Sequence, residues 1–135
     1  MKAFTSIILA LFLSVIAFAQ QTANYVVNWH FGQQSAANFT NGTPVNEVSE
    51  IIGNEAITTM SDGDGNVLFY SSSDSVWDAT NRIMPGSYGL MGTFTASCGL
   101  VSCRVPGACD QYYLFYISNS VNGSNPKLEA FTRTY

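Results

Sequence analysis

The sequence predicts an all-β protein, and three observations support this class. Glycine, asparagine, serine and threonine interrupt the chain every few residues, and the segments between them are short and rich in β-branched or aromatic residues. Helical periodicity is nearly absent. The triplet Leu-Phe-Tyr occurs at residues 68–70 and again at 114–116, each time in an apolar run that borders a turn-forming cluster. Short strands separated by turn residues are typical of β-sandwiches and β-propellers.

The composition excludes several classes of function. The 135 residues are 47% hydrophobic, 13% aromatic and 10% charged, and the net charge is −4. Low charge with high apolar content excludes a disordered tail, a coiled coil and a basic nucleic-acid arm. An acidic balance also gives no general attraction for nucleic acid or anionic lipid. We therefore expect no nucleic-acid partner, and the length allows one domain at most.

The N-terminus predicts a signal peptide over residues 1–19. Lys2 gives a positive start, residues 7–16 are almost wholly apolar, and Ala-Phe-Ala at 17–19 predicts cleavage between Ala19 and Gln20. A transmembrane anchor is the alternative, but this apolar run falls well short of the roughly 20 residues that span a bilayer. The residue directly after the cleavage site is not a cysteine, which argues against a lipid anchor. We expect an extracellular or outer-surface protein without a transmembrane segment.

Apolar runs and turn clusters predict the strands of residues 20–135. Two pairs of runs flank turn signals and predict β-hairpins, one around the Asp-Gly-Asp-Gly-Asn cluster at 62–66 and one around Pro106-Gly107. A loop at 119–126 precedes the last run. In chain order the predicted strands are 25–31, 55–60, 67–70, 100–105, 112–117 and 128–134.

The two hairpins predict a propeller-like architecture. Leu68 and Leu114 begin the shared triplet, 46 residues apart, and an all-β repeat of roughly 40–50 residues is typical of propeller blades. Both runs are apolar on successive residues, which predicts strands covered on both faces, as in stacked blades. Residues 20–135 correspond to about two to three blades, and closure typically needs four or more. We therefore expect an incomplete propeller that is a fragment of a longer chain, with a small β-sandwich as the alternative.

Several short motifs follow one another along almost the whole mature chain. They are Asn28-Trp29-His30-Phe31-Gly32, Ser61-Asp62 through Leu68-Phe69-Tyr70, Val76-Trp77-Asp78, Ile83-Met84-Pro85, Val105-Pro106-Gly107 and Tyr112-Tyr113-Leu114-Phe115. In this order they resemble the N-terminal region of exported Bacteroidetes surface proteins of the gliding-motility-associated, type IX secretion sorting-domain kind. The resemblance implies a β-propeller-like surface module.

Two features depart from that family. Its C-terminal sorting domain does not occur in these 135 residues, and the turn after Val105 reads Pro-Gly-Ala-Cys where the family has Pro-x-Pro-Gly. The resemblance therefore supports location and fold, and it implies no catalytic residues.

The Asp-rich turn is a candidate calcium site. Asp62, Asp64 and Asn66 have the D-x-D-x-N spacing of calcium loops, but Val67 and Ser73 occupy the positions where an EF-hand needs glycine and glutamate. A hairpin turn is the favoured interpretation, because aspartate, asparagine and glycine tolerate positive φ.

Three cysteines, Cys98, Cys103 and Cys109, lie close together in the sequence. Export exposes them to oxidising conditions, so we expect one disulfide and one free thiol. On one extended strand Cys98 and Cys103 would be roughly 16 Å apart, too far to bond. Cys103 and Cys109 flank the Pro106-Gly107 turn and are the better pair, although a two-residue turn would place them on opposite faces.

The sequence predicts no catalytic residue, cofactor or metal requirement. His30 is the one histidine, it lies in a strand-like motif, and no G-x-S-x-G element accompanies it. Glu47, Glu50 and Glu55 are close in sequence, but paired carboxylate chemistry depends on a separation in space. We interpret them as solvated loop residues.

Aromatic residues have two interpretations, a sugar-stacking platform or the core and blade interfaces. We favour the second because they fall on predicted strands. These residues are Tyr25, Trp29, Trp77, Tyr88, Tyr112 and Tyr113.

The sequence therefore predicts a non-enzymatic secreted or cell-surface β-module that contacts other surface proteins or glycans. The alternative is a fragment of a secreted glycan-active enzyme whose catalytic residues lie beyond Tyr135. The sequence downstream of codon 135 would separate the two. A sorting domain or adhesin-like repeats there would support the first, and a catalytic carboxylate pair or triad would support the second.

Overall fold

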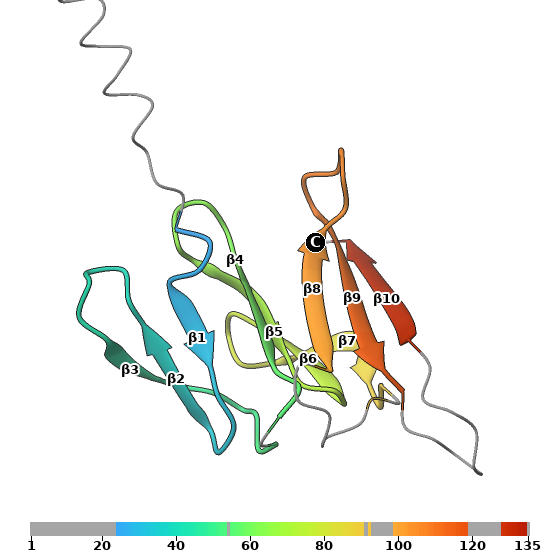
Figure 1. Ribbon diagram of the computed structural model, residues 1–135, viewed down its shortest axis with the longest axis horizontal. Helices are drawn as coiled ribbons and strands as arrows, with labels where there is room; N and C mark the ends of the chain where they lie inside the picture. The colour runs from blue at the N-terminus through green and yellow to red at the C-terminus, as the bar shows by residue number, and fades with distance from the viewer. Residues whose placement is uncertain (1–23, 54, 91, 93–98, 119–127, 135) are drawn as a thin grey trace, which may run out of the picture.

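The computed structural model describes residues 24–53, 55–90, 92, 99–118 and 128–134. In these segments the regular elements are ten β-strands in three antiparallel sheets, without a helix (Figure 1). The predicted all-β class is confirmed. The predicted signal peptide lies outside the described residues, and within them no helix has the length and apolar character needed to cross a membrane.

Each sheet is a meander whose strands pair in chain order, β1-β2-β3, β4-β5-β6-β7 and β8-β9-β10. The strands are β1 (Asn28–His30), β2 (Ser35–Asn38), β3 (Val45–Val48), β4 (Thr58–Ser61), β5 (Val67–Ser71), β6 (Ser75–Asp78), β7 (Ile83–Tyr88), β8 (Leu100–Arg104), β9 (Gln111–Ile117) and β10 (Leu128–Thr134).

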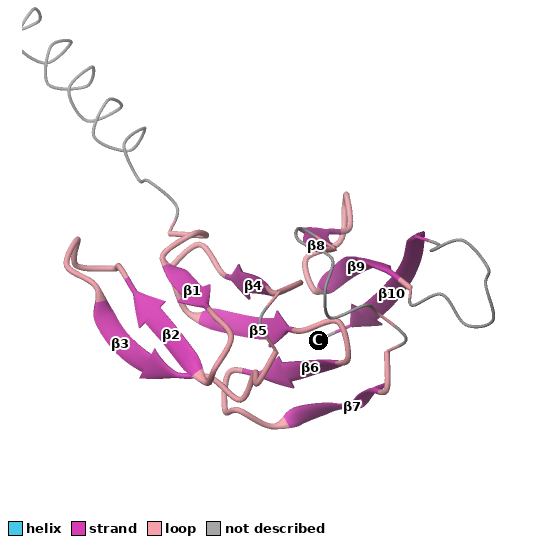
Figure 2. Cartoon of the chain, turned by 60° about the horizontal axis from the view of Figure 1, so that its bottom comes forward, coloured by secondary structure: helices cyan, strands magenta, loops and turns pink. Residues whose placement is uncertain are grey.

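The four-stranded sheet lies between the two three-stranded sheets, as both ribbon views show (Figures 1 and 2). Its strand β4 is in contact with β1 on one side and with β8 on the other. None of the three sheets closes on itself among the described residues. The arrangement is therefore an open stack of antiparallel sheets, and a small β-sandwich describes it as well as a set of blades does.

Both predicted hairpins and the last predicted strand are confirmed. The turn at 62–66 joins β4 to β5, the turn after Arg104 joins β8 to β9, and β10 has the bounds expected for it. The first predicted strand is too long, because residues 25–27 form a turn and only 28–30 pair with β2. Local turn chemistry thus fixed the hairpins, whereas the strand's length depended on its partner.

Four strands, β2, β3, β6 and β7, have no counterpart among the predicted strands. β2 has the sequence Ser-Ala-Ala-Asn, which lacks β-branched and aromatic residues, and β7 contains Pro85 and Gly86. These segments form strands because neighbouring strands supply their hydrogen bonds. β-Propensity is a weak guide where pairing and burial decide the conformation.

The main core lies between the four-stranded sheet and the sheet β8–β10. The rings of Phe69 on β5 and Tyr112 on β9 meet edge to face, with centroids 5.3 Å apart. The buried residues of this core are Ala56, Phe69, Val76, Met84, Leu100, Tyr112, Leu114 and Tyr116. This core packs the β8–β9 hairpin against the sheet that contains the β4–β5 hairpin.

The prediction of strands covered on both faces is confirmed for one Leu-Phe-Tyr copy and wrong for the other. In β5 the successive residues Phe69 and Tyr70 are both buried, with 4% and 1% of their surface exposed. Phe69 packs towards β9, and Tyr70 packs towards β1. In β9 burial alternates, so Leu114 and Tyr116 are buried whereas Phe115 is half-buried. The two strands differ because of their positions. β5 has another sheet packed on each of its faces, whereas only one face of β9 packs on the core.

Candidate functional site: an exposed aromatic groove

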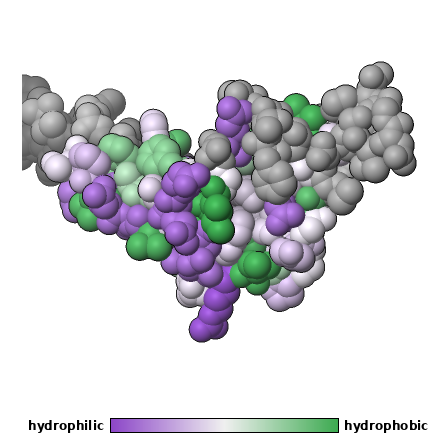
Figure 3. Space-filling model, turned by 90° about the horizontal axis from the view of Figure 1, so that it is seen from below, coloured by the Kyte–Doolittle hydropathy of each residue, from purple (hydrophilic) through white to green (hydrophobic). Residues whose placement is uncertain are grey.

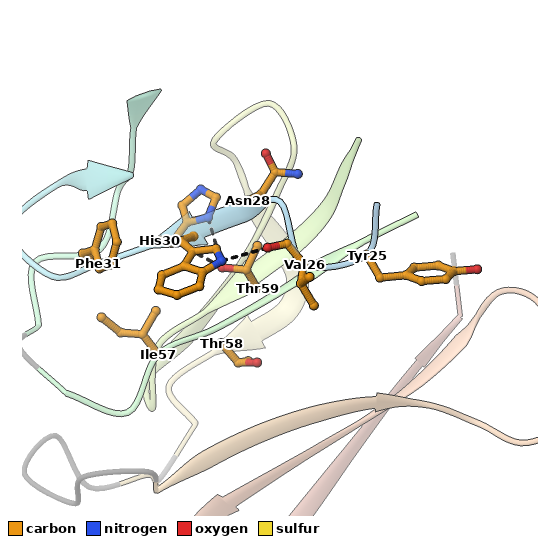
Figure 4. A pocket seen from close by; sticks show the side chains of 9 residues that line it. Tyr25, Val26, Asn28, His30, Phe31, Ile57, Thr58 and Thr59 are labelled. Atoms are coloured by element: carbon orange, nitrogen blue, oxygen red, sulfur yellow. Dashed lines mark hydrogen bonds between the residues drawn. The ribbon is translucent and has the colours of Figure 1, made fainter. Parts of the chain in front are cut away.

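A groove of about 360 Å³ opens beside β1 and the start of β4 (Figure 4). Aromatic and aliphatic side chains and two threonine hydroxyls line it. The lining residues are Tyr25, Val26, Asn28, Trp29, His30, Phe31, Ile57, Thr58 and Thr59. The segments that form it are separated by about thirty residues, and it exists because β1 lies against β4.

Trp29 is the most prominent side chain of the groove. Its surface is 53% exposed, yet its Nε1–H donates a hydrogen bond of 2.8 Å to the carbonyl oxygen of Val26. The indole also packs against two tilted rings, with centroid distances of 6.3 Å to Phe31 and 5.5 Å to Phe39. We call Trp29, Phe31 and Phe39 the aromatic cluster. The hydrogen bond and the ring contacts hold a largely exposed indole in one orientation.

Asn28 ties the strand that carries Trp29 to the neighbouring hairpin. It is buried, and its Nδ2 donates to Ser61 Oγ at 2.9 Å and to the Gly65 carbonyl oxygen at 2.7 Å. Its Oδ1 accepts a hydrogen bond of 2.7 Å from Asn38 Nδ2. Successive residues of a strand point to opposite faces, so the buried amide of Asn28 fixes the strand while Trp29 faces outward.

The Asp-rich loop at 62–66 is the other half of this attachment. Asp62 Oδ1 accepts hydrogen bonds from the backbone N–H groups of Asp64 and Asn66, at 3.0 and 2.9 Å, and its Oδ2 accepts one of 2.9 Å from Asn66 Nδ2. These bonds, chiefly that of the Asn66 side chain, hold the pKa of Asp62 below its ordinary value. The candidate calcium residues thus form the turn, with Asp62 as its internal acceptor. No group of three His, Cys, Asp or Glu side chains within the described segments is placed to hold a metal ion.

Gly65 lets the loop approach β1 closely. Its φ is +92°, a conformation that favours glycine, and a Cβ there would lie 3.1 Å from both the Asn24 Cβ and the Val27 Cγ2. The Asn24 N–H also donates to the Gly63 carbonyl oxygen at 3.0 Å. The sequence predicted this turn correctly, but it gave no sign that the turn supports the Trp29 strand.

The side chain of His30 lies between β1 and the four-stranded sheet. Its ring is stacked on that of Tyr70, with centroids 3.9 Å apart and planes 11° from parallel. Its Nδ1 lies 3.1 Å from Thr59 Oγ1, and its backbone N–H donates to the same oxygen at 3.3 Å. Burial lowers the pKa of His30 to about 4, so the ring is neutral at neutral pH. Its hydrogen-bond partner is a hydroxyl, unlike the carboxylate that orients a catalytic-triad histidine.

The stack continues from His30 through Tyr70 to Trp77. The Tyr70 and Trp77 rings are nearly parallel, with centroids 5.5 Å apart and planes 7° from parallel. The Tyr70 hydroxyl donates to Asn81 Oδ1 at 2.8 Å and accepts from the Glu50 N–H at 3.2 Å. Burial raises the pKa of Tyr70. No local pattern in the sequence indicates this stack, because it depends on the cross-strand register of β5 and β6, which places Tyr70 opposite Trp77.

The predicted core role of the aromatic residues is correct for Tyr112 and wrong for three others. Tyr112 is 4% exposed, but Tyr25, Trp29 and Tyr88 are 47%, 53% and 75% exposed. Tyr113 is half-buried and contacts the ring of Phe115 at 5.6 Å. Residues on a strand face either the core or the solvent, and the sequence did not show which face each sheet covers.

Cys103 and Cys109 are exposed free thiols in the structure, so the predicted disulfide is not formed there. Cys103 lies opposite Tyr113 in the β8–β9 ladder. Cys109 lies in the turn, which is longer than two residues and runs from Val105 to Asp110. The objection to this pairing was that a two-residue turn would place the thiols on opposite faces, and the longer turn removes that objection without joining them. Cys98 lies outside the described residues.

The three glutamates are exposed, but one is not in a loop. Glu47 lies in β3, where it pairs with Ala36 of β2. Glu50 lines a small hollow of about 160 Å³ together with Asp74 and Trp77, and Glu55 precedes β4. Strand β3 is exposed at every position. Its sequence therefore lacks the alternation of apolar and polar residues that would have predicted a strand.

Hydrophobic side chains also reach the surface away from the groove. In the view from below they form separate patches between hydrophilic residues (Figure 3). Single exposed apolar residues are normal on protein surfaces. The aromatic cluster differs because Trp29 contacts both other rings and lines a groove together with Phe31.

No protein-family model matches the chain, and no curated protein or solved structure matches it.

Proposed function

We propose that this chain is a non-enzymatic, exported or cell-surface β-module that contacts glycans or other surface proteins through the aromatic groove. The observation that carries the proposal is Trp29, which is exposed over 53% of its surface while a hydrogen bond and two ring contacts fix it. Tryptophan is enriched among the side chains that dominate binding interfaces. A fixed ring also loses little conformational entropy on binding.

The proposed architecture is a set of propeller-like blades within a larger surface protein. Three features support it: the chain-order meander of each sheet, the burial of β5 on both faces, and the resemblance to gliding-motility-associated Bacteroidetes proteins. In a propeller, each blade is a meander packed face to face with its neighbours. A small β-sandwich is the alternative, and a longer version of the chain that crystallises as a closed ring would exclude it.

Export and surface contact are tested together. The full chain is expressed in a Bacteroidetes host, and mass spectrometry of the exported product should find Gln20 as its first residue. The purified product, labelled with a fluorophore, should bind to the surface of the host cells. The Trp29→Ala variant should lose this binding, whereas Tyr88→Ala, which removes a more exposed ring outside the groove, should keep it. Retention of the chain in the cytoplasm, or surface binding that ignores Trp29, would refute the proposal.

The second candidate function is a fragment of a secreted glycan-active enzyme. The same open groove favours it, because enzymes that act on polysaccharides also need an exposed surface to hold the substrate. Incubation of a version of the chain that is extended beyond Tyr135 with soluble polysaccharides, followed by a reducing-end assay, separates the two functions. We expect no release of reducing ends, and release by the extended chain would establish the enzyme instead.

A further inference from the structure

We propose that the aromatic groove binds a neutral saccharide, with the C–H face of a pyranose ring stacked on the indole of Trp29. This inference rests on the proposed function and names the ligand class of the same site. It follows from the charge of the lining, the arrangement of apolar and polar groups, and the size of the groove.

The lining of the groove carries no formal charge. None of its nine residues is an aspartate, glutamate, lysine or arginine, and its histidine is the neutral ring stacked on Tyr70. The Arg104 guanidinium lies 6.0 Å from the centroid of the Tyr25 ring. Tyr25, however, points away from His30 and Phe31 in the close view (Figure 4). A charged ligand on Trp29 would give up hydration without gaining a countercharge, so the groove fits a neutral one.

The groove also combines an apolar surface with hydroxyl groups, as a sugar ring requires. A pyranose has C–H groups on its faces and hydroxyls around its rim, so one part stacks on an aromatic ring and the other needs hydrogen bonds. Thr58 lines the groove beside Ile57, and its Oγ1 lies 2.8 Å from Ser102 Oγ. A hydroxyl offers one donor and two acceptor positions. Thr58 therefore has capacity for a ligand hydroxyl in addition to Ser102.

The size of the groove favours a short saccharide over a protein partner. Its volume of about 360 Å³ is near the lower end of small-molecule sites, ~300–1,000 Å³. A stable protein interface buries ~800 Å² on each partner, which is more surface than a groove of this size presents. The occupant to which we commit is a neutral oligosaccharide, and a second copy of the chain is an outcome that the test must separate from it.

The test is a titration of the purified full chain with three probes, cellotriose, maltotriose and the acidic trimer of galacturonic acid, by calorimetry and tryptophan fluorescence. We expect at least one neutral trimer to bind and to change the tryptophan emission, and the acidic trimer to bind more weakly. Trp29→Ala should weaken binding about tenfold or more, and Trp29→Phe, which keeps a smaller ring, should weaken it less. Tyr88→Ala is the matched control and should bind as the unaltered chain does.

A second variant tests the polar side of the groove without removing the indole. Thr58→Val keeps the shape of the side chain and removes the hydroxyl, and it should weaken binding a few-fold. Circular dichroism verifies that each variant is folded. Binding by neither neutral trimer at concentrations of about 10 mM, preference for the acidic trimer, or binding indifferent to Trp29 would overturn the proposal. Trp29-dependent self-association without sugar binding would also overturn it and would assign the groove to a second copy.

Treatment of the host cells distinguishes this inference from the proposed function. Periodate cleaves the vicinal diols of glycans, so it should abolish Trp29-dependent surface binding, and protease treatment should leave that binding in place. The reverse pattern would refute the saccharide while the contact function stands. If untreated cells show no Trp29-dependent surface binding, the proposed function itself is refuted.

Discussion

His30 should make the folded chain less stable as the pH falls from about 7.5 to about 5. Burial lowers its pKa from 6.5 to about 4 in the folded chain, and the unfolded chain keeps the ordinary value. Between these two values the unfolded state binds a proton at His30 and the folded state does not. The proton therefore favours unfolding, and stability decreases as the pH falls through 6.5 and levels off below about 4.

The magnitude follows from the pKa difference and the exposure of the ring. At pH 5 the unscreened difference is worth about 2 kcal/mol of unfolding free energy. The ring is only half-buried, so solvent screening reduces the expected loss to about 1 kcal/mol. The stacked Tyr70 ring and the Thr59 hydroxyl carry no charge in this pH range, and they do not offset it.

The assay is urea denaturation at several pH values between 7.5 and 5, followed by circular dichroism. The matched variant is His30→Phe, which keeps a ring against Tyr70 and removes the titrating group. The window stops near pH 5 because hydrogen bonds hold the pKa values of Asp62 and Asp78 below 3.8. The stability that these carboxylates contribute is lost only below that window. An equal loss of stability in His30→Phe would refute the assignment to His30.

Three further predictions concern the attachment of β1 to the β4–β5 hairpin. Asn28→Ala removes two hydrogen bonds to that hairpin and leaves the buried Gly65 carbonyl unpaired. The free energy of unfolding, measured in urea, should fall by about 2–3 kcal/mol. An unchanged urea midpoint would show that Asn28 does not attach β1 to the hairpin. Gly65→Ala should lower the free energy of unfolding by about 2 kcal/mol, because the added Cβ meets both backbone strain and close neighbouring atoms. Gly42→Ala, where φ is also positive but no atom lies within 4 Å, should lower it by about 1 kcal/mol. Equal losses would show that the close approach of the loop to residues 24 and 27 is unimportant. Asp62→Ala should lower the melting temperature more than Asp64→Ala, whose side chain accepts none of the turn's bonds; calcium-dependent melting of the unaltered chain would instead support the metal site.

The hairpins were predictable because their turns depend on neighbouring residues. The Asp-Gly-Asp-Gly-Asn cluster forms its turn with its own side-chain and backbone hydrogen bonds. The strands β2 and β7 were not predictable. β2 lacks β-branched and aromatic residues, Pro85 and Gly86 interrupt β7, and both strands pair with partners supplied by the fold.

The candidate site was predictable only in part. Trp29 and Phe31 are two residues apart in a run expected to be extended, which predicts a shared face. Phe39 and Thr58 join that face through sheet pairing and through the packing of β1 on β4. No local pattern connects residues so far apart in the sequence.

By itself the sequence determined the all-β class, the two hairpins and the presence of many aromatic residues. Turn residues and side-chain branching act over a few neighbouring positions, so a linear pattern contains that information. The tertiary structure alone decided which aromatic rings are buried, since Tyr70 lies between two sheets and Trp29 faces outward. Burial depends on which surfaces meet in space, and those contacts join β1, β4 and β5 across long stretches of chain.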